Sequence, residues 1–122
     1  MLSFPIIDTH LHIWDTHRLS YGWLEDVPKL NRSFGLSDYN DAVEGIDVEQ
    51  MVFVQCEVDT DQYLDEATWV AEQAEIDPRI SGLVLWAPLE TGAAVADSLE
   101  QLSSIKNLKG IRRIIQFEPN ME

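Results

Sequence analysis

Four short apolar runs rich in β-branched residues recur along this chain, and they limit the folds open to it. They span residues 6–12, 51–57, 80–87 and 111–117. Their length and composition are typical of buried strands. The last three runs begin about 30 residues apart, which is the spacing of βαβ units in a parallel sheet. The pattern therefore predicts an α/β fold with parallel strands.

Helical patterns fill the intervals between these runs. In the second interval, the apolar positions at the spacing of one helix face are Tyr63, Ala67, Val70 and Ala74. The polar residues expected off that face are Glu66, Glu72, Gln73 and Glu75. Asp77-Pro78 should end this helix, because a residue before proline is pushed out of the α region.

Two further helices complete the alternation of strands and helices. A similar apolar stripe, followed by Lys109-Gly110, consists of Val95, Leu99, Leu102 and Ile105. A shorter helix is expected from Ser37, a candidate N-cap, to Gly45, a candidate stop. No linker or repeat interrupts the order, so residues 1–122 are predicted to form one domain.

Charge and cysteine content exclude some classes of function. Asp and Glu total 22 against 8 Lys and Arg, and a formal charge of -14 would repel nucleic acid and anionic lipid. The single cysteine excludes an internal disulfide and fits a reducing compartment. We see no signal-peptide pattern and no apolar run near the ~20 residues of a membrane span. These features predict a cytoplasmic protein without nucleic-acid or membrane partners.

Two histidines stand one residue apart at the end of the first run. Alternation along a strand puts Asp8, His10 and His12 on one face, with the Cα atoms of the two histidines about 6.6 Å apart. Two imidazole nitrogens can then converge on one cation, as zinc requires. The alternative is a pair of polar residues where a strand meets solvent. The position favours a site, because ligands of parallel sheets bind outside the carboxyl ends of the strands.

Other strand ends also carry polar groups. Gln55 and Glu57 share one face of the second run, and Glu57 is a candidate metal ligand or a solvated loop residue. Arg112 either clamps a substrate carboxylate or carbonyl, or makes a structural ion pair. The residues predicted on one face of the fourth run are Arg112, Ile114, Gln116 and Glu118; those predicted opposite are Arg113, Ile115 and Phe117.

The longer first interval is rich in aromatic and turn residues from 15 to 35, where a substrate loop would lie. The aromatic side chains that either bind a ring-shaped ligand or pack in the core are Trp14, Trp23 and Trp86. We take Trp14 as a substrate-binding candidate. Cys56 is expected to be a small core residue rather than a nucleophile, and His17 a solvated loop residue.

Four segments resemble successive blocks of the amidohydrolase-2 family: IIDTHLHIWD, VFVQCEVD, GLVLWAPLE and LKGIRRIIQFEP. The pattern is most similar to the sugar-lactone and pyrone-dicarboxylate lactonases. The resemblance implies the N-terminal half of a (β/α)8 TIM barrel, with four parallel strands and intervening helices. It places His10 and His12 in the metal motif of the first strand. It also places Arg112 at a substrate-binding arginine, with Gln116 as a further contact.

The resemblance also implies an activity. A divalent ion, expected to be zinc, would polarise a lactone carbonyl and activate water. Metal dependence varies in this branch, so the alternative is that the histidines hold substrate oxygens directly. The proton-handling carboxylate of the family is an aspartate after the eighth strand. A whole barrel takes ~250 residues, so that aspartate is expected beyond residue 122, and no catalytic residue is assigned.

Three functions remain open from the sequence. The first is hydrolysis of a sugar lactone or a related lactone. The second is metal-dependent decarboxylation of a carboxylic acid, since related barrels share the paired histidines. The third is a non-catalytic half-barrel. Because four strands leave two open sheet edges, we expect the chain to pair with a second copy or with a complementary C-terminal half.

Overall fold

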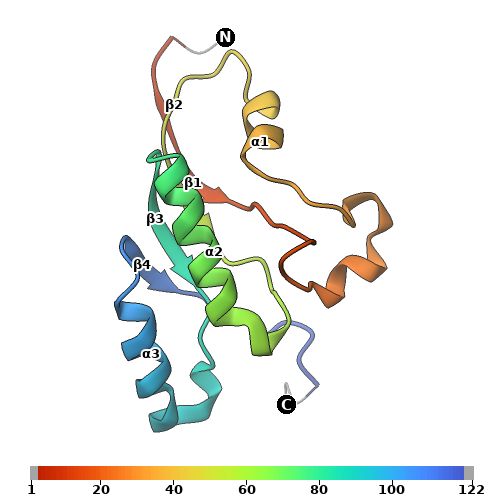
Figure 1. Ribbon diagram of the computed structural model, residues 1–122, viewed down its shortest axis with the longest axis vertical. Helices are drawn as coiled ribbons and strands as arrows, with labels where there is room; N and C mark the ends of the chain where they lie inside the picture. The colour runs from red at the N-terminus through yellow and green to blue at the C-terminus, as the bar shows by residue number, and fades with distance from the viewer. Residues whose placement is uncertain (1–2, 120–122) are drawn as a thin grey trace.

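The computed structural model describes residues 3–119 and contains one four-stranded sheet (Figure 1). Its strands are β1 (Ile6–Leu11), β2 (Val48–Val54), β3 (Ile80–Leu85) and β4 (Leu108–Ile111). They lie in the order β1-β2-β3-β4, and every neighbouring pair is parallel. The predicted α/β class with four parallel strands is confirmed.

Helices connect the strands, and α2 lies across one face of the sheet in Figure 1. The α-helices of the described residues are α1 (Leu36–Ala42), α2 (Tyr63–Ile76) and α3 (Val95–Ser103). The short 3-10 helices are η1 (Gly22–Asp26), η2 (Pro28–Leu30), η3 (Thr60–Gln62) and η4 (Leu89–Ala94). As expected, α2 stops before Pro78, with Asp77 in an extended conformation. In this part of the chain, no helix is both long enough and apolar enough to cross a bilayer.

The core lies between α2, α3 and the covered face of the sheet. Side chains there that are at most 1% exposed include Met51, Phe53, Leu83, Leu85, Ala67, Val70 and Leu102. Each large apolar side chain buried in this way contributes about 1.5–3 kcal/mol to stability. This packing fixes the strands whose carboxyl ends carry the polar residues discussed below.

Most of the predicted strand boundaries and the predicted N-cap of α1 are wrong. The fourth strand is Leu108–Ile111 rather than 111–117, because the chain leaves the sheet after the N–H of Arg112 donates to Leu85 O. The second strand ends at Val54, three residues earlier than predicted. The N-cap of α1 is Gly35 rather than Ser37, and the Asp38 carboxylate accepts the Gly35 N–H at 2.9 Å.

The turn before β4 depends on a left-handed residue. Asn107 has φ 70°, and its carbonyl accepts the N–H of Leu83 at 2.9 Å. Alanine strains this conformation, so Asn107→Ala should lower the free energy of unfolding by about 1 kcal/mol. Asn107→Gly should be tolerated, because glycine adopts positive φ freely. Urea denaturation checks this result; equal stability of the alanine variant and the wild type would contradict it.

Candidate functional site

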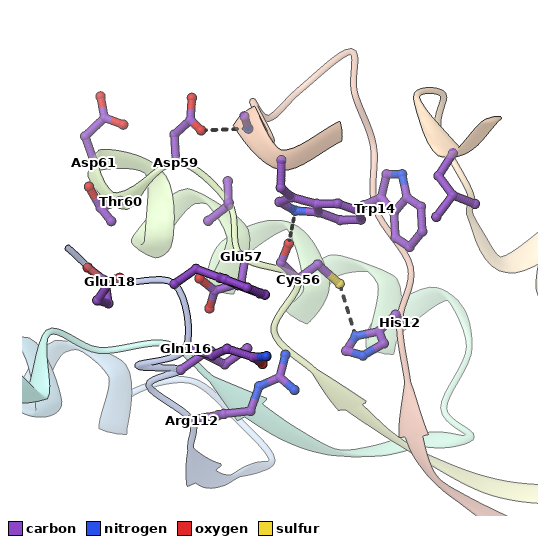
Figure 2. Close-up of a pocket in the computed structure, with 16 residues that line it drawn as sticks. His12, Trp14, Cys56, Glu57, Asp59, Thr60, Asp61, Arg112, Gln116 and Glu118 are labelled. Carbon is purple, nitrogen blue, oxygen red and sulfur yellow. Dashed lines mark hydrogen bonds between the residues drawn. The ribbon is translucent and has the colours of Figure 1, made fainter. Parts of the chain in front are cut away.

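A cleft of about 840 Å³ opens beside the carboxyl ends of the strands (Figure 2). Residues that follow β1, β2 and β4 contribute His12, Cys56, Glu57 and Arg112 to its lining. The remaining wall includes Trp14, Trp23, Leu30, Ile114, Gln116, Phe117 and Glu118. Most of the polar residues predicted from the strand ends, though not His10 or Gln55, therefore line one cleft with aromatic and apolar side chains, which is the usual composition of a small-molecule site.

The two histidines converge, as their shared strand face predicts. His10 Nε2 lies 3.0 Å from His12 Nε2. His12 Nδ1 lies 2.9 Å from the carbonyl oxygen of Val54, so Nδ1 carries the proton that this oxygen accepts. Nε2 of a neutral His12 therefore carries a lone pair, which accepts the hydrogen bond from Nε2 of His10.

Burial lowers the pKa of His12, and this effect outweighs the opposing contact with Val54 O. The positive charges of His10 and Arg112 lower it further. The imidazole is consequently favoured in the neutral form, which is the form that binds metal ions.

This pair fits two of the ligands of a metal ion. Two nitrogens bound to one tetrahedral zinc lie roughly 3.3 Å apart, close to the separation of the two Nε2 atoms. A backbone carbonyl on the other ring nitrogen is the usual support of a metal-binding histidine. Within residues 3–119, no group of three His, Cys, Asp or Glu side chains is arranged to hold a metal ion. A third ligand would have to come from elsewhere.

Glu57 makes other contacts instead of joining the histidines. Its Oε1 accepts the Gln55 side-chain amide at 2.6 Å, and Gln55 Oε1 accepts the Glu57 N–H at 2.7 Å. Its backbone has φ 52°, because the chain has already left β2 at Val54. The described structure therefore does not support the predicted metal-ligand role of Glu57, although the residue does line the cleft.

The two consecutive arginines point to different surroundings. Arg112 lines the cleft and donates from Nη2 to the carbonyl oxygen of Gln55 at 2.6 Å. Its buried Nε–H finds no acceptor among residues 3–119. Arg113 instead pairs with Glu90 at 2.9 Å and with Glu118 at 3.0 Å. Arg112 is thus the one of these two arginines that lines the cleft and makes no ion pair among the described residues.

The sequence predicted that Arg112 and Arg113 point to opposite faces of a strand. This explanation is wrong, because residues 112–117 are not a strand. Phe117 was expected on the face opposite Gln116, yet both line the cleft. Phe117 has φ 70°, which breaks the alternation of side chains.

Two tryptophans form an aromatic wall of the cleft. The rings of Trp14 and Trp23 meet edge to face, with centroids 5.7 Å apart. Their indole N–H groups donate to the carbonyl oxygens of Arg32 and Cys56 at 2.7 and 2.9 Å. Trp86 is not part of the cleft lining and packs against Tyr63.

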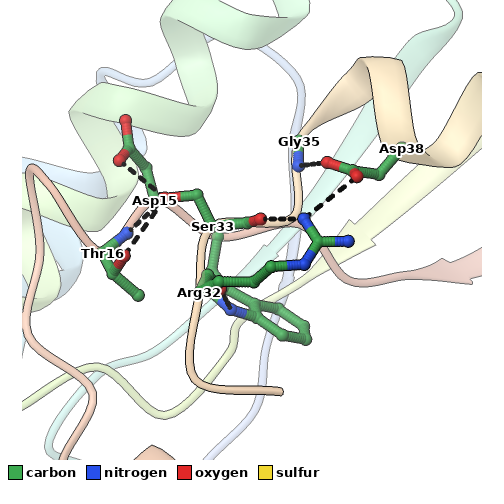
Figure 3. Close-up of polar contacts among 7 residues, drawn as sticks. Asp15, Thr16, Arg32, Ser33, Gly35 and Asp38 are labelled. Carbon is green, nitrogen blue, oxygen red and sulfur yellow. Dashed lines mark hydrogen bonds and ion pairs between the residues drawn. The ribbon is translucent and has the colours of Figure 1, made fainter. Parts of the chain in front are cut away.

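Polar contacts hold the two ends of the segment from 15 to 35 together (Figure 3). Ser33 Oγ donates to the carboxylate of Asp15 at 3.2 Å and accepts the Thr16 N–H at 2.9 Å. Arg32 pairs with Asp38 at 3.1 Å. Gly22, Trp23 and Leu30 of this segment line the cleft, so it lies where a substrate loop would.

Cys56 and His17 differ in their surroundings. Cys56 is 5% exposed, and burial raises the pKa of its thiol well above the usual range. Its Sγ lies 3.4 Å from His12 Nδ1, but a buried protonated thiol is a poor nucleophile, as expected for a core residue. His17 is exposed in the loop.

Glu66 is a functional candidate that sequence reasoning placed wrongly. It was expected off the apolar face of α2, but it is only 1% exposed. Its Oε2 accepts the Cys56 N–H at 3.0 Å, and burial raises the pKa of the carboxyl to about 7. The spacing of Glu66 could have indicated its burial, because it lies three residues after Tyr63 and four before Val70, on the same apolar stripe.

Comparisons with known proteins agree with this architecture. No family model matches the sequence. The chain is 25% identical over 126 residues to the uncharacterised protein y4mH of Sinorhizobium fredii, covering 96% of this chain and 42% of that protein. It is structurally similar to amidohydrolase 2 from Bifidobacterium longum subsp. infantis, with a TM-score of 0.60 and 25% identity, covering 70% of this chain and 33% of that one. The chain thus spans less than half the length of either protein, and its four parallel strands and intervening helices match part of an amidohydrolase barrel.

Proposed function

We propose that this chain contributes to a metal-dependent hydrolase of the amidohydrolase type that acts on a sugar lactone or a related lactone. The observation that carries the proposal is the convergence of His10 and His12 at the end of β1, on an α/β fold similar to amidohydrolase 2. The cleft beside them has both aromatic walls and a guanidinium donor, which suits a small oxygen-rich ring.

Each residue would have a separate part in this reaction. His10 and His12 would hold the divalent ion, for which zinc fits the two nitrogen donors. When bound, the ion supplies polarisation of the lactone carbonyl and a lower pKa of water. The guanidinium of Arg112 would hold substrate oxygens, and Trp14 and Gln116 would contact the ring. In a metal-free enzyme of this type, the histidines would instead bind the substrate oxygens.

A comparison of the two arginines tests this assignment. Arg112→Met should weaken binding of an aldonate, the product of sugar-lactone hydrolysis, by about 10- to 100-fold, because a hydrogen bond to a charged group is worth ~1.5–3 kcal/mol. Arg113→Met should have a smaller effect, since Arg113 contacts Glu90 and Glu118 instead. Calorimetric titration measures both affinities. A larger loss for Arg113→Met would remove Arg112 from the proposed binding site.

Decarboxylation is the second candidate, because the guanidinium of Arg112, which lines the cleft without an ion pair among the described residues, would suit a substrate carboxylate equally well. The two reactions differ in product. Proton release from a panel of sugar lactones would support the hydrolase, whereas CO2 release from carboxylated substrates would support the decarboxylase. An assembly that binds these compounds and releases neither product would favour a non-catalytic role.

We also propose that the chain assembles through its sheet. In the described residues, β1 and β4 each have one neighbour only, so each leaves an edge of unpaired backbone groups. Strand pairing with a second copy, or with a complementary C-terminal half, would satisfy these groups. Sedimentation equilibrium of the 122-residue chain should therefore show self-association. A monomer at all concentrations, together with no binding of a complementary half, would contradict this proposal.

A further inference from the structure

Three successive carbonyl groups at the end of β2 each accept a hydrogen bond from a different cleft side chain. The acceptors are the carbonyl oxygens of residues 54–56, in chain order. The donors, in the same order, are Nδ1 of His12 at 2.9 Å, Nη2 of Arg112 at 2.6 Å and Nε1 of Trp23 at 2.9 Å. Figure 2 shows His12 and Arg112 beside Cys56, on separate parts of the chain. The position of this backbone therefore decides how all three side chains face the cleft.

Sheet pairing holds only the start of the segment, where the Gln55 N–H donates to Val84 O at 2.8 Å. The chain leaves β2 after Val54, and Glu57 has the left-handed φ of 52°. A non-glycine residue adopts that conformation at a cost of roughly 1–2 kcal/mol, so other contacts must hold it. The reciprocal bonds between Gln55 and Glu57 provide one such contact. The N–H of Cys56, which lies between them, needs an acceptor from another element.

Glu66 provides that acceptor from α2. Its Oε2 accepts the Cys56 N–H at 3.0 Å, although the residue is 1% exposed and lies on the apolar stripe of the helix. Its Oε1 is buried without a hydrogen-bond partner among the described residues. Packing alone would favour an apolar side chain here, because a buried carboxyl with one unpartnered oxygen costs stability. The carboxyl thus has a role other than filling the core.

We propose that Glu66 is a positioning residue of the cleft. It fixes the backbone of residues 54–57, and this backbone orients His12, Arg112 and Trp23. This role adds a residue to the proposed function. It rests on that function only for which ligand the cleft binds. If Glu66 were merely a core residue, replacing it would change stability and leave the hydrogen bonds of the cleft side chains unchanged.

The first test follows the indole N–H resonances of the tryptophans by NMR, which needs no activity. Glu66→Met removes the acceptor at similar length, so the Trp23 indole signal should move towards that of an unbonded indole. Glu66→Gln keeps an acceptor oxygen and should retain the wild-type signal. Trp86 lies outside the cleft and serves as the internal reference. Glu75→Met, on an exposed position of the same helix, is the matched control and should move neither signal.

The second test measures Zn²⁺ affinity. We expect this affinity to fall about tenfold in Glu66→Met, because a metal-binding histidine that loses its supporting contacts binds the ion less tightly. Glu66→Gln should keep the wild-type affinity. A wild type that binds no Zn²⁺ would count against the proposed function, while the indole signals would still test the positioning role. If the methionine variant does not fold, Glu66→Asp replaces it, because the shorter side chain cannot reach the Cys56 N–H. An unchanged Trp23 signal in a folded variant without the acceptor would overturn the proposal.

Discussion

Glu66→Gln should make the protein more stable than the wild type by about 3 kcal/mol at pH 8 and by less than about 1 kcal/mol at pH 5. Burial raises the pKa of the Glu66 carboxyl from 4.5 to about 7. Each pKa unit between the folded and unfolded states corresponds to ~1.4 kcal/mol, and this carboxyl is almost fully removed from solvent. Glutamine has similar size and keeps an acceptor for the Cys56 N–H, but it cannot ionise.

The direction of the pH dependence follows from the raised pKa. Below pH 4.5 the carboxyl is protonated in both states, so its contribution to folding is fully present. As the pH rises towards 7, the unfolded chain releases this proton while the folded protein keeps it, and the free energy of unfolding falls. Above pH 7 the folded protein carries a buried carboxylate, and the loss is complete.

Urea denaturation at pH 5, 6, 7 and 8 measures this difference between variant and wild type. Other carboxyl groups titrate in both proteins, so only the difference reports on Glu66. Glu75→Gln, at an exposed position of α2, should give a curve parallel to that of the wild type. If Glu66→Gln also gave a parallel curve, the carboxyl would not change its ionisation between the folded and unfolded protein.

Apolar periodicity was sufficient to predict the order of elements, because buried strands and amphipathic helices need distinct spacings of apolar residues. It failed at the fourth strand, where the run 111–117 contains Ile115 and Phe117. These side chains are 67% and 90% exposed, so their apolar character does not reflect burial in the sheet. The real β4 contains Lys109 and Gly110, and a short strand of this composition has no strong signal in sequence.

For the candidate site, local geometry was predictable and contacts between distant segments were not. Alternation along one strand was enough to bring His10 and His12 together. Nothing in the sequence shows that the indole of Trp23 reaches the carbonyl of Cys56, because that contact depends on the path of the loop 15–35. Glu66 was missed because a carboxylate on a helix is usually solvated, even when its spacing matches the apolar stripe.

Replacing both His10 and His12 with alanine should weaken Zn²⁺ binding by more than about a hundredfold, because both nitrogen donors are removed. The two Nε2 atoms lie 3.0 Å apart, and the Nδ1–H of His12 is held by a backbone carbonyl. The proposed site would therefore be formed before the ion arrives, and little ordering of side chains would oppose binding. Equilibrium dialysis against Zn²⁺ measures the affinity, and circular dichroism confirms that the double variant is folded.

The excess of carboxylates requires a strict control, since a chain of net charge -14 attracts any divalent ion. Excess Mg²⁺ should occupy these carboxylates without displacing Zn²⁺ from imidazole nitrogens. His17→Ala removes the remaining histidine, which lies exposed in the loop, and should keep wild-type affinity. Equal Zn²⁺ binding by the wild type and the double variant would show that His10 and His12 are not ligands. If the wild type bound no Zn²⁺ but lost aldonate binding in the double variant, the histidines would hold substrate oxygens directly.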